Sequence, residues 1–252
     1  MVRDVETYFG NYTGAYGFEC EIVHYRQTVI VERLRALRPN RILEIGCGID
    51  VLPEIAAAAG ITWESWTIVE ADQRFADFAR KAKAPNLTIV PGFLEEVTDR
   101  IPGPYDYIIC ASLLQEAPSA EAMLAALRGR MGSASRLHIN VPSTTSLHRR
   151  LARSMGLIND LSTFSDRNRR LQHHRVFDMA SLRNLVEQNG FRVSLTGGHS
   201  VKPFTHDQMA AISESLWRDV LDGLFELGKE MPDIASEIHV EVCRPDQMEN
   251  QK

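Results

Sequence analysis

The stretch Arg41-Ile-Leu-Glu-Ile-Gly-Cys-Gly-Ile-Asp50 decides the fold of this 252-residue chain. Apolar residues lead into Gly46 and Gly48, and a helical pattern over residues 51–59 begins directly afterwards. Glycines at a strand-to-helix turn let the backbone bend tightly and approach a ligand, while the helix N–H groups point at the polar end of that ligand. The stretch therefore predicts a ligand-binding turn after a first strand.

Short apolar segments alternate with helical patterns along the rest of the chain. After the strand at 41–45, further strands are predicted at 66–70, 87–90, 105–110, 136–141, 191–195 and 238–242. Nearly continuous apolar strands separated by helices are typical of a parallel sheet covered on both faces. In the last segment, apolar positions 238, 240 and 242 alternate with polar ones. This alternation favours a half-exposed strand near a sheet edge.

Two acids near the glycine turn narrow the choice of ligand. Glu70 ends the second predicted strand, and an acid there accepts hydrogen bonds from both ribose hydroxyls of an adenosine ligand. Glu44 lies two residues before Gly46, where a dinucleotide fold is more usually apolar. The third glycine of the dinucleotide fingerprint would fall on Val51, and no G-x-x-x-x-G-K-[ST] motif occurs. An NAD oxidoreductase and a P-loop NTPase are therefore disfavoured.

These motifs resemble those of class I S-adenosylmethionine-dependent methyltransferases of the small-molecule type. Glu44-Ile-Gly-Cys-Gly48 resembles the E-x-G-x-G motif, and Val69-Glu-Ala-Asp72 resembles the acidic second-strand motif. Pro91-Gly-Phe-Leu-Glu95 resembles the third-strand loop that borders adenine, and residues 105–116 resemble the fourth-strand motif. The resemblance implies an α/β, Rossmann-like, doubly wound sheet of seven strands. Most strands would be parallel, the final one antiparallel, with a helical lid insert.

The resemblance also implies S-adenosylmethionine as cofactor and S-adenosylhomocysteine as product. Gly46 and Gly48 would lie against the methionine part, Glu44 would help to hold the amino group, and Glu70 would bind the ribose. Phe93 and Leu94 would flank adenine. The residues predicted to bind the cofactor are Glu44, Gly46, Cys47, Gly48, Asp50, Glu70, Ala71, Gly92, Phe93, Leu94, Ala111 and Ser112.

Three positions depart from the family pattern. Asp50 replaces the usual third glycine, and we expect it either to cap the following helix or to receive the ammonium group of the cofactor. Phe93 stands where the family often has an acid, so the amino group of adenine needs another partner. Gln115-Glu116 replaces the commoner Glu-His. None of these changes removes the glycine or ribose contacts, so cofactor binding is still expected.

The chain is predicted to form a methyltransferase domain over residues 41–244, preceded by an aromatic lid and helix at 1–40 and followed by a tail at 245–252. Residues 143–175 form the predicted substrate-covering insert, with one or two short helices. The insert holds seven arginines and two aspartates, a net +5, so the rest of the chain carries −10. Its positive field favours a carboxylate or phosphate acceptor bound by Arg149 and Arg175. A solvated helical face is the alternative interpretation.

Candidate catalytic residues lie at the end of the fifth strand and at the end of the insert that follows it. His173-His174-Arg175-Val-Phe177 resembles a segment of several small-molecule methyltransferases. His174, with His173 as second choice, would remove a proton from the acceptor, or would only hydrogen-bond the lid. Asn140 ends the fifth strand, where it would either face the cavity or only end the strand.

Aromatic residues near the N-terminus are candidates for binding the acceptor. Tyr12, Tyr16 and Tyr25 would cover the sulfonium, because a positive charge suits ring faces, or would serve in packing. No histidine pair has metal-ligand spacing, so no metal is predicted. The helical pattern at 205–229 would either pack inward or form the surface of a homodimer.

The expected reaction is in-line SN2 transfer of a methyl group to an oxygen or nitrogen atom of a small molecule. The alternatives are other sulfonium chemistry, such as cyclisation of the cofactor, and a non-catalytic cofactor-binding subunit. The net charge of −5 argues against non-specific nucleic-acid binding. No apolar stretch reaches membrane-spanning length, and the four cysteines are scattered, so no membrane partner and a cytoplasmic location are expected.

Overall fold

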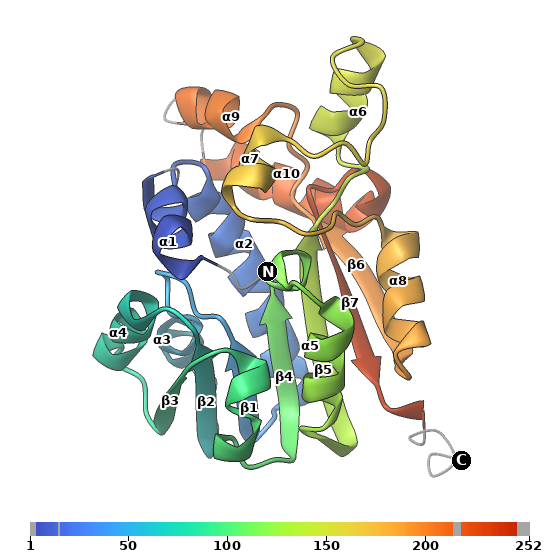
Figure 1. Cartoon of the computed structure of the whole chain (residues 1–252). Helices are drawn as coiled ribbons and strands as arrows, with labels where there is room; N and C mark the ends of the chain where they lie inside the picture. The colour runs from blue at the N-terminus through green and yellow to red at the C-terminus, as the bar shows by residue number, and fades with distance from the viewer. Residues whose placement is uncertain (1–3, 15, 214–217, 246–252) are drawn as a thin grey trace.

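A single mixed sheet of seven strands organises the computed structural model, which describes residues 4–14, 16–213 and 218–245. The strand order is β3-β2-β1-β4-β5-β7-β6 (Figure 1). Only β7 runs antiparallel to its neighbours β5 and β6. The predicted sheet is therefore confirmed. Its strands are β1 (Arg41–Ile45), β2 (Ser65–Glu70), β3 (Leu87–Pro91), β4 (Tyr105–Ala111), β5 (Met131–Pro142), β6 (Arg192–His199) and β7 (Glu237–Cys243).

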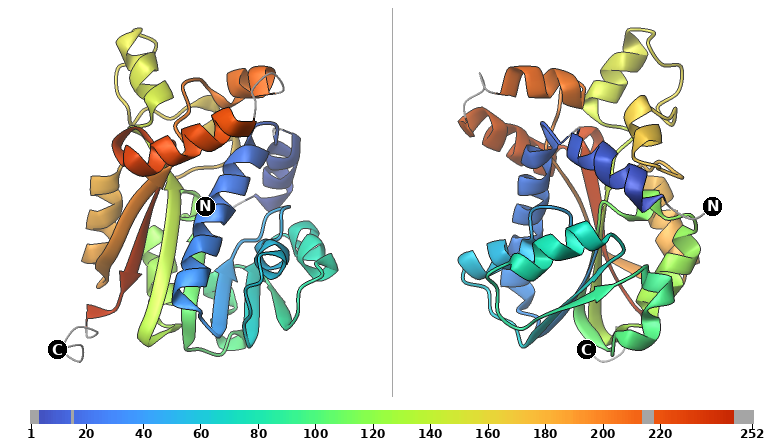
Figure 2. Two further views of the ribbon diagram at one scale, coloured as in Figure 1. Left: turned by 180° about the vertical axis from the view of Figure 1, so that it is seen from behind. Right: turned by 60° about the vertical axis from the view of Figure 1, so that its left-hand side comes forward.

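Helices cover both faces of this sheet. Side chains of α5 and α8 pack on one face, and those of α2, α3 and α4 pack on the other. The view from behind in Figure 2 shows α2 and α10 crossing the same face. The helices are α1 (Val5–Gly14), α2 (Glu19–Leu37), α3 (Leu52–Ala58), α4 (Gln73–Lys81), α5 (Ala120–Arg128), α6 (Leu147–Ser154), α7 (Asp166–Arg170), α8 (Met179–Gln188), α9 (His206–Ser213) and α10 (Arg218–Glu230).

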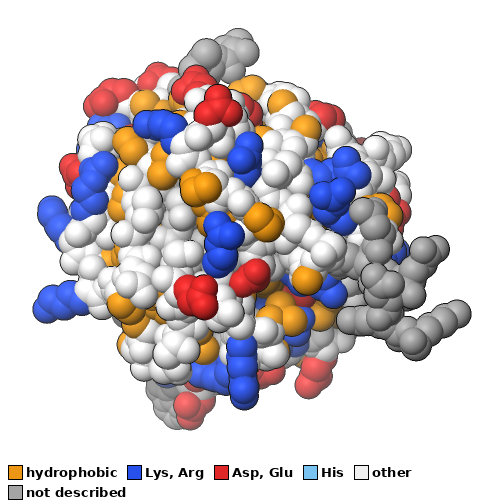
Figure 3. Space-filling model, turned by 90° about the horizontal axis from the view of Figure 1, so that it is seen from below, with side chains coloured by type: hydrophobic (Ala, Val, Ile, Leu, Met, Phe, Trp, Pro, Cys, Tyr) orange, Lys and Arg blue, Asp and Glu red, His pale blue; other side chains and the backbone are white. Residues whose placement is uncertain are grey.

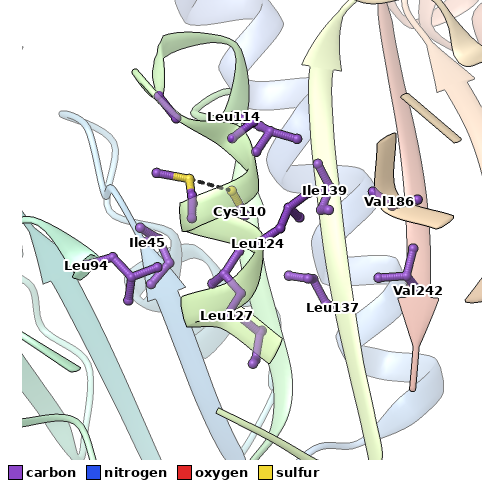
Figure 4. Packing of buried hydrophobic residues seen from close by; sticks show 14 of the residues in the cluster. Ile45, Leu94, Cys110, Leu114, Leu124, Leu127, Leu137, Ile139, Val186 and Val242 are labelled. Carbon is purple, nitrogen blue, oxygen red and sulfur yellow. Dashed lines mark hydrogen bonds between the residues drawn. The ribbon is translucent and has the colours of Figure 1, made fainter. Parts of the chain in front are cut away.

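The larger apolar core lies between the sheet and α5 with α8 (Figure 4). Leu124 and Leu127 of α5 are fully buried against Leu137 and Ile139 of β5. Close packing of such side chains contributes about 1.5–3 kcal/mol each relative to leaving them in water. This core holds β4 and β5 together, and with them the positions at which both strands end.

Capping side chains begin two of the helices that cover the sheet. Ser119 accepts a hydrogen bond from the N–H of Ala122 at the start of α5. Asp178 and Ser181 form a reciprocal capping box at the start of α8. Each cap satisfies helix N–H groups that have no partner within the helix.

The last strand is wrongly predicted as half-exposed. β7 lies between β5 and β6, and all seven of its residues are buried. Its two glutamates are satisfied by partners from other elements: Glu237 accepts from Arg26, while Glu241 accepts from Arg33 and from the Tyr107 hydroxyl. The alternation of apolar and polar residues in β7 therefore belongs to an interior strand. Ion pairs, rather than water, satisfy the glutamates on its polar side.

The segment predicted as one helix at 205–229 contains α9 and α10. Residues 214–217 between them lie outside the described residues, as do 246–252 of the predicted tail. Met209, Leu221 and Phe225 pack inward against α2. Leu227 of α10 is exposed.

The insert and the N-terminal helix lie above the upper ends of the parallel strands (Figure 1). Residues 143–175 hold α6 and α7 and no strand. The opposite end of the molecule shows basic and acidic side chains interspersed (Figure 3). Among the described residues no helix has the length and apolar character that crossing a membrane requires.

Candidate functional site

A cavity of about 210 Å³ lies at the carboxyl ends of the strands. At one end it is lined by Gly46, Gly48 and Glu70, which we call the glycine end. At the other it is lined by Lys202 and His206, which we call the lysine end. The carboxyl edge of an open parallel sheet is where ligands bind in such folds. A smaller cavity of about 60 Å³ adjoins the first one. Gly46 and Glu70 line both cavities.

The turn after β1 has the conformation that its glycines permit. Gly46 has φ +73° and Gly48 has φ +60°, in the left-handed region that favours glycine. A Cβ atom built on Gly48 would lie 3.6 Å from the Tyr12 hydroxyl. The turn therefore presents bare backbone to the cavity.

Glu70 is fixed against this turn. One carboxylate oxygen accepts from the N–H of Cys47 at 3.0 Å, and the other accepts from the N–H of Asp72 at 2.9 Å. A carboxylate oxygen can accept more than one hydrogen bond, so ribose hydroxyls can be bound in addition. Cys47 and Ala71 line the cavity beside it. Burial raises the pKa of the Cys47 thiol above its ordinary range, so the thiol stays protonated.

Glu44 lies beneath the turn and is almost completely buried. Its carboxylate accepts from the indole N–H of Trp66 at 2.9 Å and lines the cavity. Burial raises the pKa of Glu44 to about 8, although the indole hydrogen bond acts in the opposite direction. The group is therefore poised to lose its proton when a cation arrives nearby.

Asp50 does not cap the following helix, so that alternative is wrong. The residue before α3 is Val51, and its side chain makes no cap. The Asp50 carboxylate instead accepts from the Tyr16 hydroxyl, and its carbonyl accepts from Gln27 of α2. Asp50 still lines the cavity, which leaves the ammonium alternative open.

The smaller cavity is lined by the loop after β3. Gly92, Phe93 and Leu94 all contribute to it, together with Glu95. A Cβ atom on Gly92 would lie 2.5 Å from Val97, so this position has no room for a side chain. Glu95, two residues after Phe93, thus contributes an acidic side chain to this cavity.

The three predicted tyrosines are not brought together at the cavity. Tyr12 lines it and stacks on Tyr8 with ring centroids 5.8 Å apart. Tyr16 is not among the lining residues. Tyr25 points away: its hydroxyl donates to Asp222 at 2.6 Å and its ring stacks on Phe225 of α10. Tyr25 therefore belongs to the packing of α2 against α10.

The preference for His174 over His173 is not supported by the geometry. His174 is exposed, whereas His173 lines the cavity. Asn168 accepts from Ser165 through its oxygen, so its nitrogen donates to Nδ1 of His173 at 3.0 Å. Nε2 of the neutral ring then carries the hydrogen, and it lies 3.9 Å from a carboxylate oxygen of Glu116. His173 therefore lies within ion-pair range of the Glu116 carboxylate, at a separation longer than a hydrogen bond.

Asn140 lies inside the sheet and lines neither cavity. Its amide nitrogen lies 3.4 Å from Nε2 of His199 and 3.4 Å from the carbonyl of Ile238. Ile139 and Val141 face the core beneath α5, so Asn140 faces the opposite side, towards His199 and α10. By contrast, Ala111 and Ser112 at the end of β4 line the larger cavity.

The two predicted arginines line the cavity but already have partners. Arg149 donates to the carbonyls of Leu161 and Thr163 within the insert. Arg175 pairs with the carboxylate of Glu121 at 3.1 Å. Both therefore stabilise the insert.

Sequence reasoning missed the lysine end. Nζ of Lys202 lies 2.6 Å from Nδ1 of His206, whose Nε2 lies 3.0 Å from Glu19. Glu19 also pairs with Arg26 at 3.2 Å and with Arg167 at 2.8 Å. These residues come from α2, α7, α9 and the loop after β6. No local motif could have revealed them, because only the fold brings these four segments together.

The mixed sheet, the glycine turn and the acid at the end of β2 define a class I S-adenosylmethionine-dependent methyltransferase. The chain belongs to the methyltransferase domain family, whose model matches residues 22–195. No curated protein matches the sequence.

Solved structures share the fold at low sequence identity. Magnesium protoporphyrin IX methyltransferase (ChlM) from Synechocystis PCC 6803 with bound SAH is 17% identical, with TM-score 0.59 and 94% of each chain covered. The plantazolicin methyltransferase BamL is 16% identical, with TM-score 0.57 and coverage of 95% of this chain and 97% of that one. A possible histamine N-methyltransferase from Thermotoga maritima is 14% identical, with TM-score 0.57 and coverage of 94% and 98%.

Proposed function

We propose that this enzyme transfers the methyl group of S-adenosylmethionine to an oxygen or nitrogen atom of a small molecule. The observation that carries the proposal is a single cavity with a glycine turn at one end and a polar, buried pocket at the other. Helices α1 and α2 and the insert contribute to its lining, which favours an acceptor small enough to be enclosed. The structural neighbours named for magnesium protoporphyrin IX and plantazolicin support a small-molecule acceptor rather than a macromolecule.

The glycine end fits the cofactor. Gly46 and Gly48 would lie against its methionine part, Glu44 would hold the ammonium group, and the Glu70 carboxylate would accept from the ribose hydroxyls. The smaller cavity would hold adenine, with Phe93 against the ring and Glu95 accepting from the amino group.

The protein's task in the reaction is to position the acceptor and to exclude water. When bound, S-adenosylmethionine supplies an electrophilic methyl group on its sulfonium. Tyr12 would cover this region with its ring face. We assign proton removal from the acceptor to the pair formed by Glu116 and His173. The carboxylate would take the proton, while the imidazole and the Tyr8 hydroxyl, which donates to Glu116 at 2.9 Å, hold it in place.

Calorimetry with S-adenosylhomocysteine tests the cofactor site. We expect Glu70→Ala to weaken binding about 10- to 100-fold, because hydrogen bonds to a charged group contribute roughly 1.5–3 kcal/mol. Glu54→Ala on the exposed face of α3 is the matched control and should bind as the wild type does. Circular dichroism checks that Glu70→Ala folds. Unchanged affinity in a folded Glu70→Ala protein would defeat the ribose assignment.

A further inference from the structure

One buried cation at the lysine end has no carboxylate of its own. Lys202 is 3% exposed and lies just after β6. Its Nζ contacts Nδ1 of His206, and within the described part of the chain no carboxylate forms an ion pair with it. A buried ammonium group without an anionic partner is costly, so such a group either loses its proton or acquires an anion.

The carboxylates nearest to Lys202 are already bound by arginines. Glu237 accepts a two-pronged pair of hydrogen bonds from Arg26 at 2.8 and 3.0 Å. Glu19 accepts from Arg26 and from Arg167. The three cations of the group thus face two carboxylates, and one positive charge is left for a ligand. Burial lowers the pKa of Lys202 to about 7; Glu19, Glu237 and Asp207 act against this effect, whereas Arg167 adds to it.

The hydrogen bond between Lys202 and His206 leaves hydrogens of the Lys202 ammonium group available to a ligand in the cavity. His206 donates from Nε2 to Glu19, so its Nδ1 accepts from Lys202. An ammonium group has three hydrogens, and this contact uses one of them. His148 also lines the pocket, and burial keeps the pKa of its ring far below the ordinary value, so the ring adds no charge. Its Nδ1 is buried without a partner among the described residues.

We propose that Lys202 binds an anionic group of the methyl acceptor, a carboxylate or a phosphate. Thr144 and the unpartnered Nδ1 of His148 lie in the same lining and would complete the contact. The sequence suggested arginine forks for this purpose, but Arg149 donates to a carbonyl of the insert and Arg175 pairs with Glu121 of α5. The identification of the ligand as the methyl acceptor rests on the proposed function. Binding of an anion to Lys202 can be tested without any methyl transfer.

The test is NMR of the lysine side chains in the full-length protein saturated with S-adenosylhomocysteine. The chain has five lysines, so the resonance of Lys202 can be assigned by its loss in Lys202→Met. Inorganic phosphate and benzoate are titrated separately. We expect one of them to raise the pKa of Lys202 by a unit or more, which corresponds to at least tenfold tighter binding to the ammonium form. The anion with the larger effect identifies the group as phosphate or carboxylate.

A control variant and a second Lys202 variant accompany this titration. Lys229→Met removes a lysine that pairs with Glu32 and Glu226 outside the cavity, and it should leave the anion effect intact. Lys202→Gln serves as a second variant if Lys202→Met does not fold. The inference is overturned if neither anion shifts the Lys202 resonance, or if both Lys202 variants bind the anion as tightly as the wild type. Failure of wild type to bind S-adenosylhomocysteine would instead refute the proposed function.

Discussion

Glu44 shows how one buried side chain can couple cofactor binding to pH. Its carboxyl group is buried against Trp66, and its pKa of about 8 keeps it mostly protonated at neutral pH. An ammonium group binds to the carboxylate form, so binding must expel the proton. The group contributes most to affinity above pH 8 and loses its contribution as the pH falls below that value.

We predict that S-adenosylhomocysteine binding releases a proton near pH 7 and tightens as the pH rises to about 8.5. Calorimetry in buffers of different ionisation enthalpy measures the released proton. Glu44→Gln should abolish the release and flatten the pH dependence, while Glu64→Gln, on the exposed loop before β2, should change neither. Proton release that persists in Glu44→Gln would show that a group other than Glu44 loses the proton on binding.

Residues of the glycine turn were predictable individually, whereas residues that face the acceptor were not. Gly46 and Glu70 are marked by a local motif, because the backbone turn that needs them is local. Tyr25 and Asn140 looked equally suitable, yet the first packs on α10 and the second lies inside the sheet. Side-chain direction at such positions depends on which helix covers the strand, and that is a tertiary property.

At the scale of elements, α10 and the end of β6 pack with almost no space between them. A Cβ atom on Gly228 would lie 2.2 Å from the backbone nitrogen of Ser200, two residues before Lys202. We predict that Gly228→Ala lowers the free energy of unfolding by about 1–3 kcal/mol, because the backbones must separate. Gly223→Ala, in the same helix with open space around it, should stabilise by up to about 1 kcal/mol.

Urea unfolding of both variants measures this difference. Equal effects of the two substitutions would mean that helix propensity, not the contact with Ser200, sets the result. A secondary expectation is that Gly228→Ala weakens phosphate or benzoate binding, since the shifted segment carries Lys202.

Element identities followed from the sequence more reliably than their extents. The first strand matches its predicted bounds, because Pro39 and Gly46 delimit it. β5 starts at Met131 rather than at residue 136, and β6 runs on to His199 through Gly197 and Gly198. Those extensions lack an apolar pattern, and pairing with β4 and β7 supplies their hydrogen bonds.

At the scale of the whole molecule, three histidines form a buried group at β5, β6 and β7. The rings of His138 and His239 stack at 5.2 Å, and His199 lies 6.5 Å from His239. Burial lowers the pKa of His239 from 6.5 to about 4 and holds the pKa values of His138 and His199 well below the ordinary value. The folded protein therefore keeps these rings neutral at a pH where the unfolded chain binds protons.

We predict that the free energy of unfolding falls as the pH is lowered from 6.5 towards about 4. Each neutral histidine contributes up to about 1.4 kcal/mol per pH unit to this slope. Urea unfolding at several pH values measures the slope, which should be shallower in His239→Gln. The exposed His24 offers a control, since His24→Gln should leave the slope unchanged. A slope that is equal in all three proteins would contradict this origin.

The sequence by itself determined the sheet, the glycine turn and the acid at the end of β2, because each depends on residues close together in the chain. Tertiary structure alone decided that β7 is interior, that Arg149 and Arg175 are occupied, and that Lys202 is left without a carboxylate. The physical reason is that the burial of a side chain and its charge partners depend on neighbouring residues that come from distant segments of the chain. Their outcome is set only once α2, the insert and the β6–α9 loop meet above the sheet.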